Sequence, residues 1–265
     1  MPMNPRLLRP LASGAFSPNQ ISGLAVWLDA ADDSTVTLNG STVSEWRDKS
    51  GNQRHFAQST AASQPEYVSG GQNGKSLIRN ATNKFLRRES GGSVLSESLS
   101  YLGQTTHTIF IAWNPNALSA SNYIFWAWNP ADSVNDRLQL TGPSASGANG
   151  LYTIDSGAFT NSRLTTTANA FTVAVPHVVT FRRDGSAFAS WGNGNNIGTA
   201  TRGSAAAVDY SGTFGLFTDV QANGNAGVSA AGDLYEVICY DRAVTDAERQ
   251  SIERYIGTKW SIVVA

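Results

Sequence analysis

The sequence has little charge and almost no cysteine. Charged residues make up 15% of its 265 positions, and the formal net charge at pH 7 is −1, whereas about a quarter of an average soluble domain is charged. A chain so close to neutral has no long-range field that attracts nucleic acid or an anionic membrane, and we expect neither partner. Cys239 is the one cysteine, so we expect no intrachain disulfide and a small buried apolar side chain.

Long apolar runs are missing as well. No stretch approaches the roughly 18 consecutive apolar residues that a membrane-spanning helix needs. The N-terminal stretch M-P-M-N-P-R-L-L-R-P contains prolines and arginines but not the apolar core of a secretory signal. If the protein acts outside a cell, we therefore expect it to leave by another route, such as within a particle released by lysis.

Catalytic patterns are also missing. A retaining glycosidase needs two carboxylates about 5–5.5 Å apart, and sandwich glucanases commonly carry them as E-x-D-x-E or E-x-D-x-x-E on one strand. No such triplet occurs; Glu236 is the one glutamate within a clear strand pattern, and Asp233 is expected on the opposite face. With no G-x-S-x-G elbow and no Walker A motif either, we expect no enzyme.

Metal ligands show no recognisable spacing. We expect polar surface or strand-edge positions for the three histidines, His55, His107 and His177. Three aspartates, Asp29, Asp32 and Asp33, could bind calcium, but a calcium site needs about six to eight oxygens from several loops. Asx side chains that close turns are far commoner. We therefore expect no cofactor, with calcium as the open alternative.

The most informative stretch that is present runs from Gly232 to Ile262. Its first part, Leu234 to Tyr240, is rich in β-branched and aromatic residues, which predicts a strand packed on both faces. Thr245 and Glu248 then have capping-box spacing, which predicts a helix over residues 245–257. Its expected apolar face consists of Ala247, Ile252, Tyr255, Ile256 and Trp260. Its expected polar face consists of Glu248, Arg249, Gln250, Glu253 and Arg254.

The rest of the chain predicts many short strands separated by turns. Glycine, serine, threonine, asparagine and alanine replace the missing charges. Short apolar stretches recur about every dozen residues, which is typical of a sandwich. Trp27 and Trp46 are expected in the core. The later strands are expected over residues 108–113, 123–128, 138–140, 151–154, 171–175, 177–182, 187–191 and 213–217.

Motifs at both ends of the chain resemble one family. The N-terminal half contains, in order, W-L-D-A-x-D-x-S-T-V, S-x-W-x-D-K-S-G-N-x-R-H, Q-P-x-Y-V and N-G-K-S. The C-terminal part contains G-D-L-Y-E-V-I-C-Y-D-R-A-V-T-D-A-E-R, which runs into a helix that ends K-W. This arrangement resembles concanavalin A-like (laminin G-like) jelly-roll domains, which occur in bacterial surface proteins and bacteriophage virion proteins. The resemblance implies an all-β, two-sheet jelly-roll sandwich over residues 21–265 with one C-terminal amphipathic helix, after an extended arm over residues 1–20.

The resemblance also implies a function. We expect a non-enzymatic virion protein, either a capsid decoration or a head or tail fibre component, with capsid or tail proteins as partners. Phage fibres and spikes are commonly trimeric, so a homotrimer is favoured. The alternatives are a glycoside hydrolase and a bacterial surface adhesion module.

The arm carries candidate docking residues. Its prolines favour an extended conformation, and its two arginines can form bidentate pairs with acidic groups on a capsid or tail protein. The arm can pack on its own domain or dock on a neighbouring subunit, and the sequence leaves both open. The candidate docking residues are Arg6, Leu7, Leu8, Arg9, Leu11 and Phe16.

The stretch from Trp128 to Arg137 is a candidate glycan-binding loop. An aromatic ring can stack on a sugar, and aspartate and asparagine side chains can bond its hydroxyls. A plain connection between strands is the alternative. The candidate residues for binding a host-surface carbohydrate are Trp128, Asn129, Asp132, Asn135 and Asp136.

Overall fold

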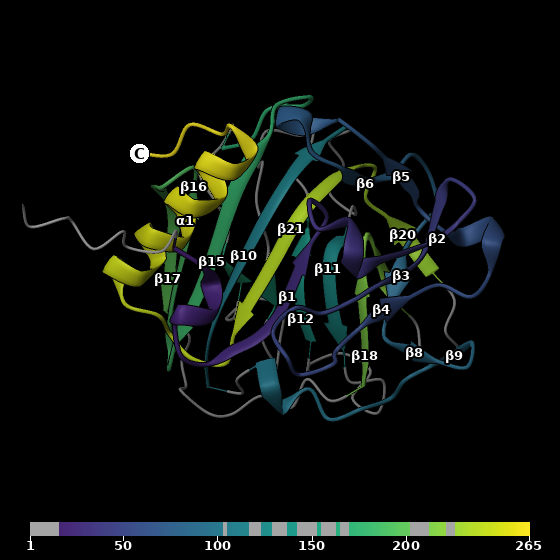
Figure 1. Cartoon of the computed structure of the whole chain (residues 1–265). Helices are drawn as coiled ribbons and strands as arrows, with labels where there is room; N and C mark the ends of the chain where they lie inside the picture. Colours follow the sequence, from purple (N-terminus) through teal and green to yellow (C-terminus); the bar gives the residue numbers. More distant parts are fainter. Residues whose placement is uncertain are drawn as a thin grey trace, which may run out of the picture.

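The computed structural model describes residues 16–102, 105–116, 123–128, 137–141, 153–154, 163–164, 170–201, 212–220 and 226–265. Within them the chain folds into two layers of mainly antiparallel strands with one helix near the C-terminus (Figure 1). This confirms the predicted all-β sandwich with a terminal helix. No helix within these ranges is long and apolar enough to cross a membrane.

One layer, called the front sheet, has the order β17-β16-β15-β10-β21-β1, and every pair in it is antiparallel. All residues of β21 are buried, as predicted for a strand packed on both faces. The strands of this sheet are β1 (Leu24–Asp29), β10 (Thr106–Pro115), β15 (His177–Asp184), β16 (Ala187–Gly192), β17 (Asn195–Thr201) and β21 (Gly232–Tyr240).

The second layer, called the back sheet, has the order β2-β3-β4-β7-β18-β11-β12. Its strands are β2 (Val36–Asn39), β3 (Thr42–Trp46), β4 (Phe56–Ala57), β7 (Leu86–Arg87), β11 (Tyr123–Trp128), β12 (Arg137–Thr141) and β18 (Thr213–Leu216). Two strands, β5 (Glu66–Val68) and β6 (Leu77–Asn80), join the layers because β5 pairs with β3 and β6 pairs with β21.

Short elements complete the described chain, and residues 171–175, expected to form a strand, instead form a turn in which Ala174 has a left-handed backbone with φ 59°. The remaining strands are β8 (Glu89–Ser90), β9 (Ser93–Val94), β13 (Thr153–Ile154), β14 (Arg163–Leu164), β19 (Thr218–Val220) and β20 (Ala226–Ser229). The 3-10 turns are η1 (Pro18–Gln20), η2 (Asp33–Thr35), η3 (Ala61–Ser63), η4 (Gln72–Gly74) and η5 (Ser100–Leu102).

The core between the sheets is apolar and rich in aromatic rings. Phe214 of β18 packs against Phe56 and Phe125, with ring centroids 4.7 Å and 4.6 Å apart. Trp46 and Cys239 are fully buried, as predicted. Burying these side chains contributes the largest favourable term to folding, at roughly 25 cal/mol for each Å² of apolar surface removed from water.

Helix α1 (Asp246–Trp260) crosses the outer face of the front sheet (Figure 1). The predicted capping box is present: the Thr245 hydroxyl accepts a hydrogen bond from the Glu248 amide, and the Glu248 carboxylate accepts one from the Thr245 amide at 2.8 Å. The helix therefore starts where the sequence predicts it, and it continues past residue 257 to Trp260.

The predicted faces of α1 are partly wrong. Arg249 and Glu253, expected on the polar face, are 5% and 1% exposed, whereas Ala247, expected on the apolar face, is exposed. The reason is that the sheet beneath α1 offers polar partners. Glu253 accepts a hydrogen bond from the Thr180 hydroxyl at 2.6 Å, and the Arg249 guanidinium lies 4.4 Å from the Trp191 ring centroid while pairing with Glu253.

The prediction for two of the histidines is partly wrong. His107 and His177 lie at the starts of β10 and β15, as expected for strand-edge positions, but both are buried rather than at the surface. His177 lies at the start of β15, where its Nε2 accepts a hydrogen bond from the Thr172 amide at 3.0 Å. Burial lowers the pKa of His177, which favours the neutral ring that such acceptance requires. His55 is half-buried and accepts from the Asp48 amide through Nδ1.

Candidate functional site

A β-bulge places Glu236 beneath helix α1. In the pairing of β10 with β21, Ala112 lies opposite Glu236 and Trp113 lies opposite Leu234, so Tyr235 has no partner across the pair. Such an extra residue resets the alternation of side chains along a strand. Tyr235 consequently also contacts the helix, since its ring stacks on that of Trp260 with centroids 5.1 Å apart.

The bulge changes the expected relation between Glu236 and Asp233. Asp233 lies opposite Asn114, and Asn114 shares a face of β10 with Ala112, so the two carboxylates lie on the same face rather than on opposite ones. They nevertheless have separate partners. Asp233 is held by a bidentate pair with Arg79, at 2.6 Å and 2.9 Å.

The Glu236 carboxylate is surrounded by donors. Its Oε1 accepts hydrogen bonds from Trp27 Nε1 at 2.7 Å and from the Tyr255 hydroxyl at 3.0 Å. Its Oε2 accepts from Trp260 Nε1 at 2.8 Å and from Lys259 Nζ at 3.0 Å. The residue is 0% exposed. Burial raises the pKa of Glu236, and the charge of Lys259 opposes this effect.

The charged groups continue from Glu236 to the surface. Lys259 also pairs with Asp29, which lies directly opposite Glu236 in the β1–β21 register. Asp29 pairs in turn with Lys49 at 2.8 Å, and Lys49 pairs with Asp32 at 2.7 Å. We call these five residues the ion chain. Each of its carboxylates has a lysine partner. Because Lys259 of α1 pairs with both Asp29 of β1 and Glu236 of β21, the ion chain connects these three elements.

The aspartates considered as calcium ligands therefore have other partners. Asp29 and Asp32 belong to the ion chain, and Asp33 accepts hydrogen bonds from the hydroxyls of Tyr67 and Ser76. Within the described ranges no group of three or more histidine, cysteine, aspartate or glutamate side chains is arranged to hold a metal ion.

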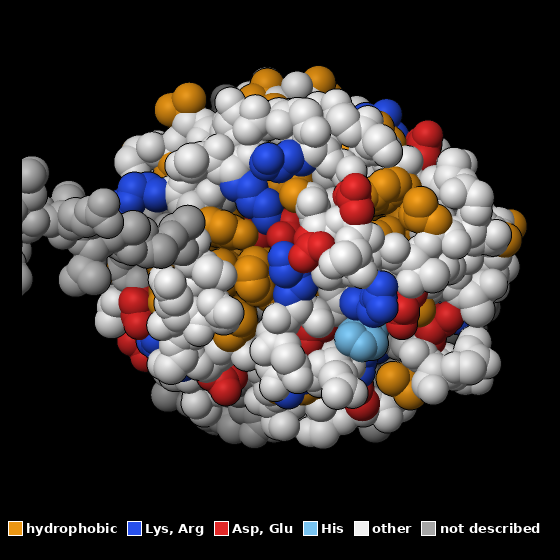
Figure 2. Space-filling view, viewed as in Figure 1, with side chains coloured by type: hydrophobic (Ala, Val, Ile, Leu, Met, Phe, Trp, Pro, Cys, Tyr) orange, Lys and Arg blue, Asp and Glu red, His pale blue; other side chains and the backbone are white. Residues whose placement is uncertain are grey.

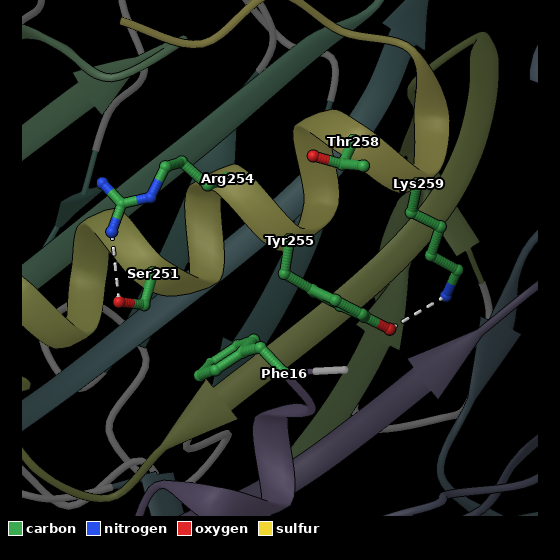
Figure 3. Close-up of a pocket in the computed structure, with 6 residues that line it drawn as sticks. All are labelled: Phe16, Ser251, Arg254, Tyr255, Thr258 and Lys259. Carbon is green, nitrogen blue, oxygen red and sulfur yellow. Dashed lines mark hydrogen bonds between the residues drawn. The ribbon is translucent and has the colours of Figure 1, made fainter. Parts of the chain in front are cut away.

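A pocket of about 490 Å³ opens beside α1, next to the ion chain. Figure 2 shows apolar, acidic and basic side chains meeting in a hollow on this face. The lining residues from α1 are spaced three and four apart and so share one side of the helix. The pocket is lined by Phe16, Ser251, Arg254, Tyr255, Thr258 and Lys259 (Figure 3).

Two aromatic rings form the apolar wall of this pocket. The rings of Phe16 and Tyr255 meet edge to face, with centroids 5.9 Å apart. The Tyr255 hydroxyl accepts from Lys259 at 3.2 Å (Figure 3). It also donates to Glu236, and the two bonds fix the direction of the ring. Burial raises the pKa of Tyr255, so the phenol stays protonated and able to donate.

A second pocket of about 390 Å³ adjoins the first. Arg254 and Thr258 line both pockets, and the C-terminal residues Ile262–Val264 supply further walls of the second. Arg254 therefore lies where the two pockets meet. Among the described residues its one hydrogen bond is a donation from Nη2 to the Ser251 hydroxyl at 3.3 Å (Figure 3).

Of the predicted docking arm, the structure describes Phe16. This ring is half-buried and packs against the chain's own core and Tyr255. The other arm residues, Arg6, Leu7, Leu8, Arg9 and Leu11, lie outside the described residues, and their role stays a prediction.

Most of the predicted glycan-binding loop lies outside the described residues. Strand β11 ends at Trp128 and β12 begins at Arg137. The Trp128 side chain and the residues Asn129, Asp132, Asn135 and Asp136 are not among those that the structure describes, and their role stays a prediction. The pocket itself was not predicted from the sequence. The sequence signal for it is the set of α1 residues at positions 251, 254, 255, 258 and 259, which share one side of the helix. This pattern does not show that Phe16 completes the apolar wall.

Similarity to known proteins appears at the level of structure. No family model and no curated protein sequence matches the chain. Domain 4 of AbnA, an extracellular GH43 arabinanase from Geobacillus stearothermophilus solved with arabinotriose, has a TM-score of 0.56 and 14% identity, over 85% of this chain and 95% of that domain.

Two further solved structures are similar. The CBM40 module of a Ruminococcus gnavus IT-sialidase, bound to α2,3-sialyllactose, has a TM-score of 0.51 and 14% identity over 70% of this chain and 100% of that one. The binding domain of Paraclostridial mosquitocidal protein 1 has a TM-score of 0.53 and 15% identity over 92% of this chain and 53% of that one. At these identities, what the chain shares with all three is a β-sandwich fold.

Proposed function

We propose that the chain is a non-enzymatic glycan-binding β-sandwich domain. The observation that carries this proposal is the pocket beside α1. Its aromatic rings, Phe16 and Tyr255, offer an apolar surface for the C–H face of a sugar, and the hydroxyls of Ser251 and Thr258 at its rim can bond sugar hydroxyls. A small-molecule site typically has this mixture of an apolar wall and a few polar groups.

The similar structures support the proposal without assigning a ligand. Two of them were solved with a bound oligosaccharide. A shared sandwich fold does not by itself assign carbohydrate binding, because function belongs to the site rather than to the fold. The chemistry of the pocket therefore carries the argument.

The ion chain argues against the alternative of a glycoside hydrolase. Glu236 and Asp29 share a face, but Lys259 lies between them and bonds both, and Glu236 has no exposed surface. A general acid or a nucleophile must reach the substrate. These two carboxylates instead hold α1 on the sheet. Sugar release that is lost in Glu236→Gln but kept in a folded Asp233→Asn control would favour the enzyme.

The finer proposal is that this domain belongs to a phage virion, as a capsid decoration or a head or tail fibre component that binds host-surface glycan. Its support is the motif order at both ends of the chain and the arginine- and leucine-containing arm. Mass spectrometry of purified particles tests it. Detection in a bacterial cell envelope without particles would favour the adhesion-module alternative.

The arm offers a separate test of assembly. We expect that deleting residues 1–15, which keeps Phe16, leaves the sandwich folded and abolishes particle attachment or the oligomer, for which three copies are favoured. Light scattering and thermal melting of the truncated protein measure both. An unchanged oligomer together with a large fall in melting temperature would show that the arm instead stabilises its own domain.

The glycan-binding proposal is tested by calorimetric titration against a panel of oligosaccharides. We expect Phe16→Ser to weaken binding of any ligand found by about tenfold, because it removes half of the aromatic wall. Leu38→Ser is the matched control, since Leu38 is an exposed apolar side chain outside the pocket. Loss in Trp128→Ala alone would move binding to the loop after β11, and a panel with no ligand would reject the proposal.

A further inference from the structure

The lining of the pocket beside α1 has an unusual balance of hydrogen-bonding groups. It contains two cations, Arg254 and Lys259, and three hydroxyls, but no carboxylate and no side-chain amide among the described lining residues. A neutral sugar presents hydroxyl groups that need acceptors as well as donors. The hydroxyls can accept as well as donate, and those of Ser251 and Tyr255 already donate within the chain, whereas the two cations only donate. The cations therefore give the lining an excess of donors, which matches a ligand with an excess of acceptors.

Only one of the two cations is available to such a ligand. Lys259 has three N–H donors, and its ammonium already bonds Asp29, Glu236 and the Tyr255 hydroxyl. Arg254 has five N–H donors. It bonds only the Ser251 hydroxyl, and it has no acidic partner within the part of the chain that the structure describes. The free donors of the pocket therefore belong mainly to Arg254.

We propose that this pocket binds an acidic sugar, a ring that carries a carboxylate, and that Arg254 is the residue that selects for it. The guanidinium fork of arginine matches a carboxylate with two parallel hydrogen bonds. Phe16 and Tyr255 then hold the apolar face of the same ring. This inference rests on the proposed function and gives it a ligand class.

The position of Arg254 adds a consequence for ligand length. Because Arg254 and Thr258 line both pockets, a carboxylate bound there lies at their junction. The next residue of an oligosaccharide can extend along the second pocket, toward Ile262–Val264. We therefore expect a disaccharide or longer acidic ligand to bind more tightly than the corresponding single sugar.

The test is calorimetric titration of the full chain with an oligogalacturonate, with its carboxyl-reduced neutral counterpart and with a sulfated neutral oligosaccharide. The wild type is expected to bind the oligogalacturonate at least tenfold more tightly than the reduced form, since a hydrogen bond to a charged group is worth about a factor of ten or more. Arg254→Gln is expected to remove this difference, and Arg254→Lys to keep part of it.

Arg47→Gln is the matched control, because it removes the same charge from an exposed arginine that does not line the pocket. Thermal melting establishes that all variants are folded. Equal binding of the acidic and reduced ligands, or equal losses in Arg254→Gln and Arg47→Gln, would overturn the inference while leaving glycan binding intact. Preference for the sulfated ligand over the carboxylate would overturn the ligand class. Binding of no glycan at all would overturn both proposals.

Discussion

The inner and outer faces of the front sheet carry different kinds of buried side chain in neighbouring rows of residues. On the inner face one row across the sheet is Leu28, Val237, Ile111 and Val179, all apolar and buried. The next row, on the outer face, begins with Asp29 and Glu236, which are also buried but charged. A single strand thus contributes to an apolar core on one side and to an ion chain on the other.

The ion chain on the outer face fixes the position of α1. Apolar contacts are not directional, so the inner core tolerates changes of shape as long as volume is kept. A buried charge is costly unless its partner is in place. Because Glu236 needs Trp27, Lys259 and Trp260 at once, α1 has one favourable position on the sheet. The pocket between α1 and Phe16 depends on that position.

The largest effect is expected from breaking the ion chain. Lys259→Met leaves Glu236 and Asp29 facing each other in a buried site without the cation between them, which should lower the free energy of unfolding by about 3–5 kcal/mol. Urea denaturation measures the loss. Adding Glu236→Gln to this variant should restore part of the stability, because one unpaired charge is removed. A loss below about 1 kcal/mol for the single variant would show that the ion chain does not hold α1.

The inner face should respond in a graded way. Ile111→Ala removes buried methyl groups and should lower the free energy of unfolding by about 2–4 kcal/mol, whereas Ile111→Val should cost about 1 kcal/mol. The same denaturation experiment compares both. If Ile111→Val were as damaging as Lys259→Met, the contrast between the two faces would disappear.

A smaller effect is expected at the start of α1. Thr245→Ala removes the side-chain cap and should cost about 1 kcal/mol. Thr245→Ser keeps the hydroxyl and serves as the control with near wild-type stability. Equal losses in both variants would mean that the capping box contributes nothing beyond the shape of the threonine side chain.

The smallest effect concerns pH. Hydrogen bonds from Arg242 lower the pKa of Glu248 from its ordinary 4.5 to about 2. A carboxyl with a lowered pKa in the folded state contributes stability above its ordinary pKa, and this contribution is lost as the pH falls from about 4.5 toward 2. Glu248→Gln should therefore flatten the fall in melting temperature across this window. Glu66→Gln, an exposed glutamate on β5, is the control. If the melting temperature of Glu248→Gln fell with pH as steeply as that of the wild type, Glu248 would be excluded as the source of this pH dependence.

Local patterns were enough to predict much of the fold. The strand ending at Tyr240, the cap at Thr245 and the burial of Trp46 and Cys239 follow from propensity, capping chemistry and side-chain type. Such signals are contained within a few neighbouring residues, so a single sequence displays them.

The outer face could not be predicted in the same way, because its partners come from distant parts of the chain. Arg249 and Glu253 are buried where Thr180 of β15 and Trp191 of β16 meet them. The bulge at Tyr235 is a property of two paired strands and leaves no mark in the alternation of one. The pocket likewise requires an arm residue to meet a helix near the other end of the chain.

The pocket beside α1 is proposed to bind a glycan without cleaving it. An NMR titration of the ¹⁵N-labelled protein with an acidic oligosaccharide, followed by an assay for new reducing ends in the same sample, tests both parts of this proposal. We predict that the amide signals of Phe16, Ser251, Arg254 and Thr258 shift with one common affinity and that the oligosaccharide stays intact. Shifts confined to residues 129–136, or the appearance of new reducing ends, would contradict this account.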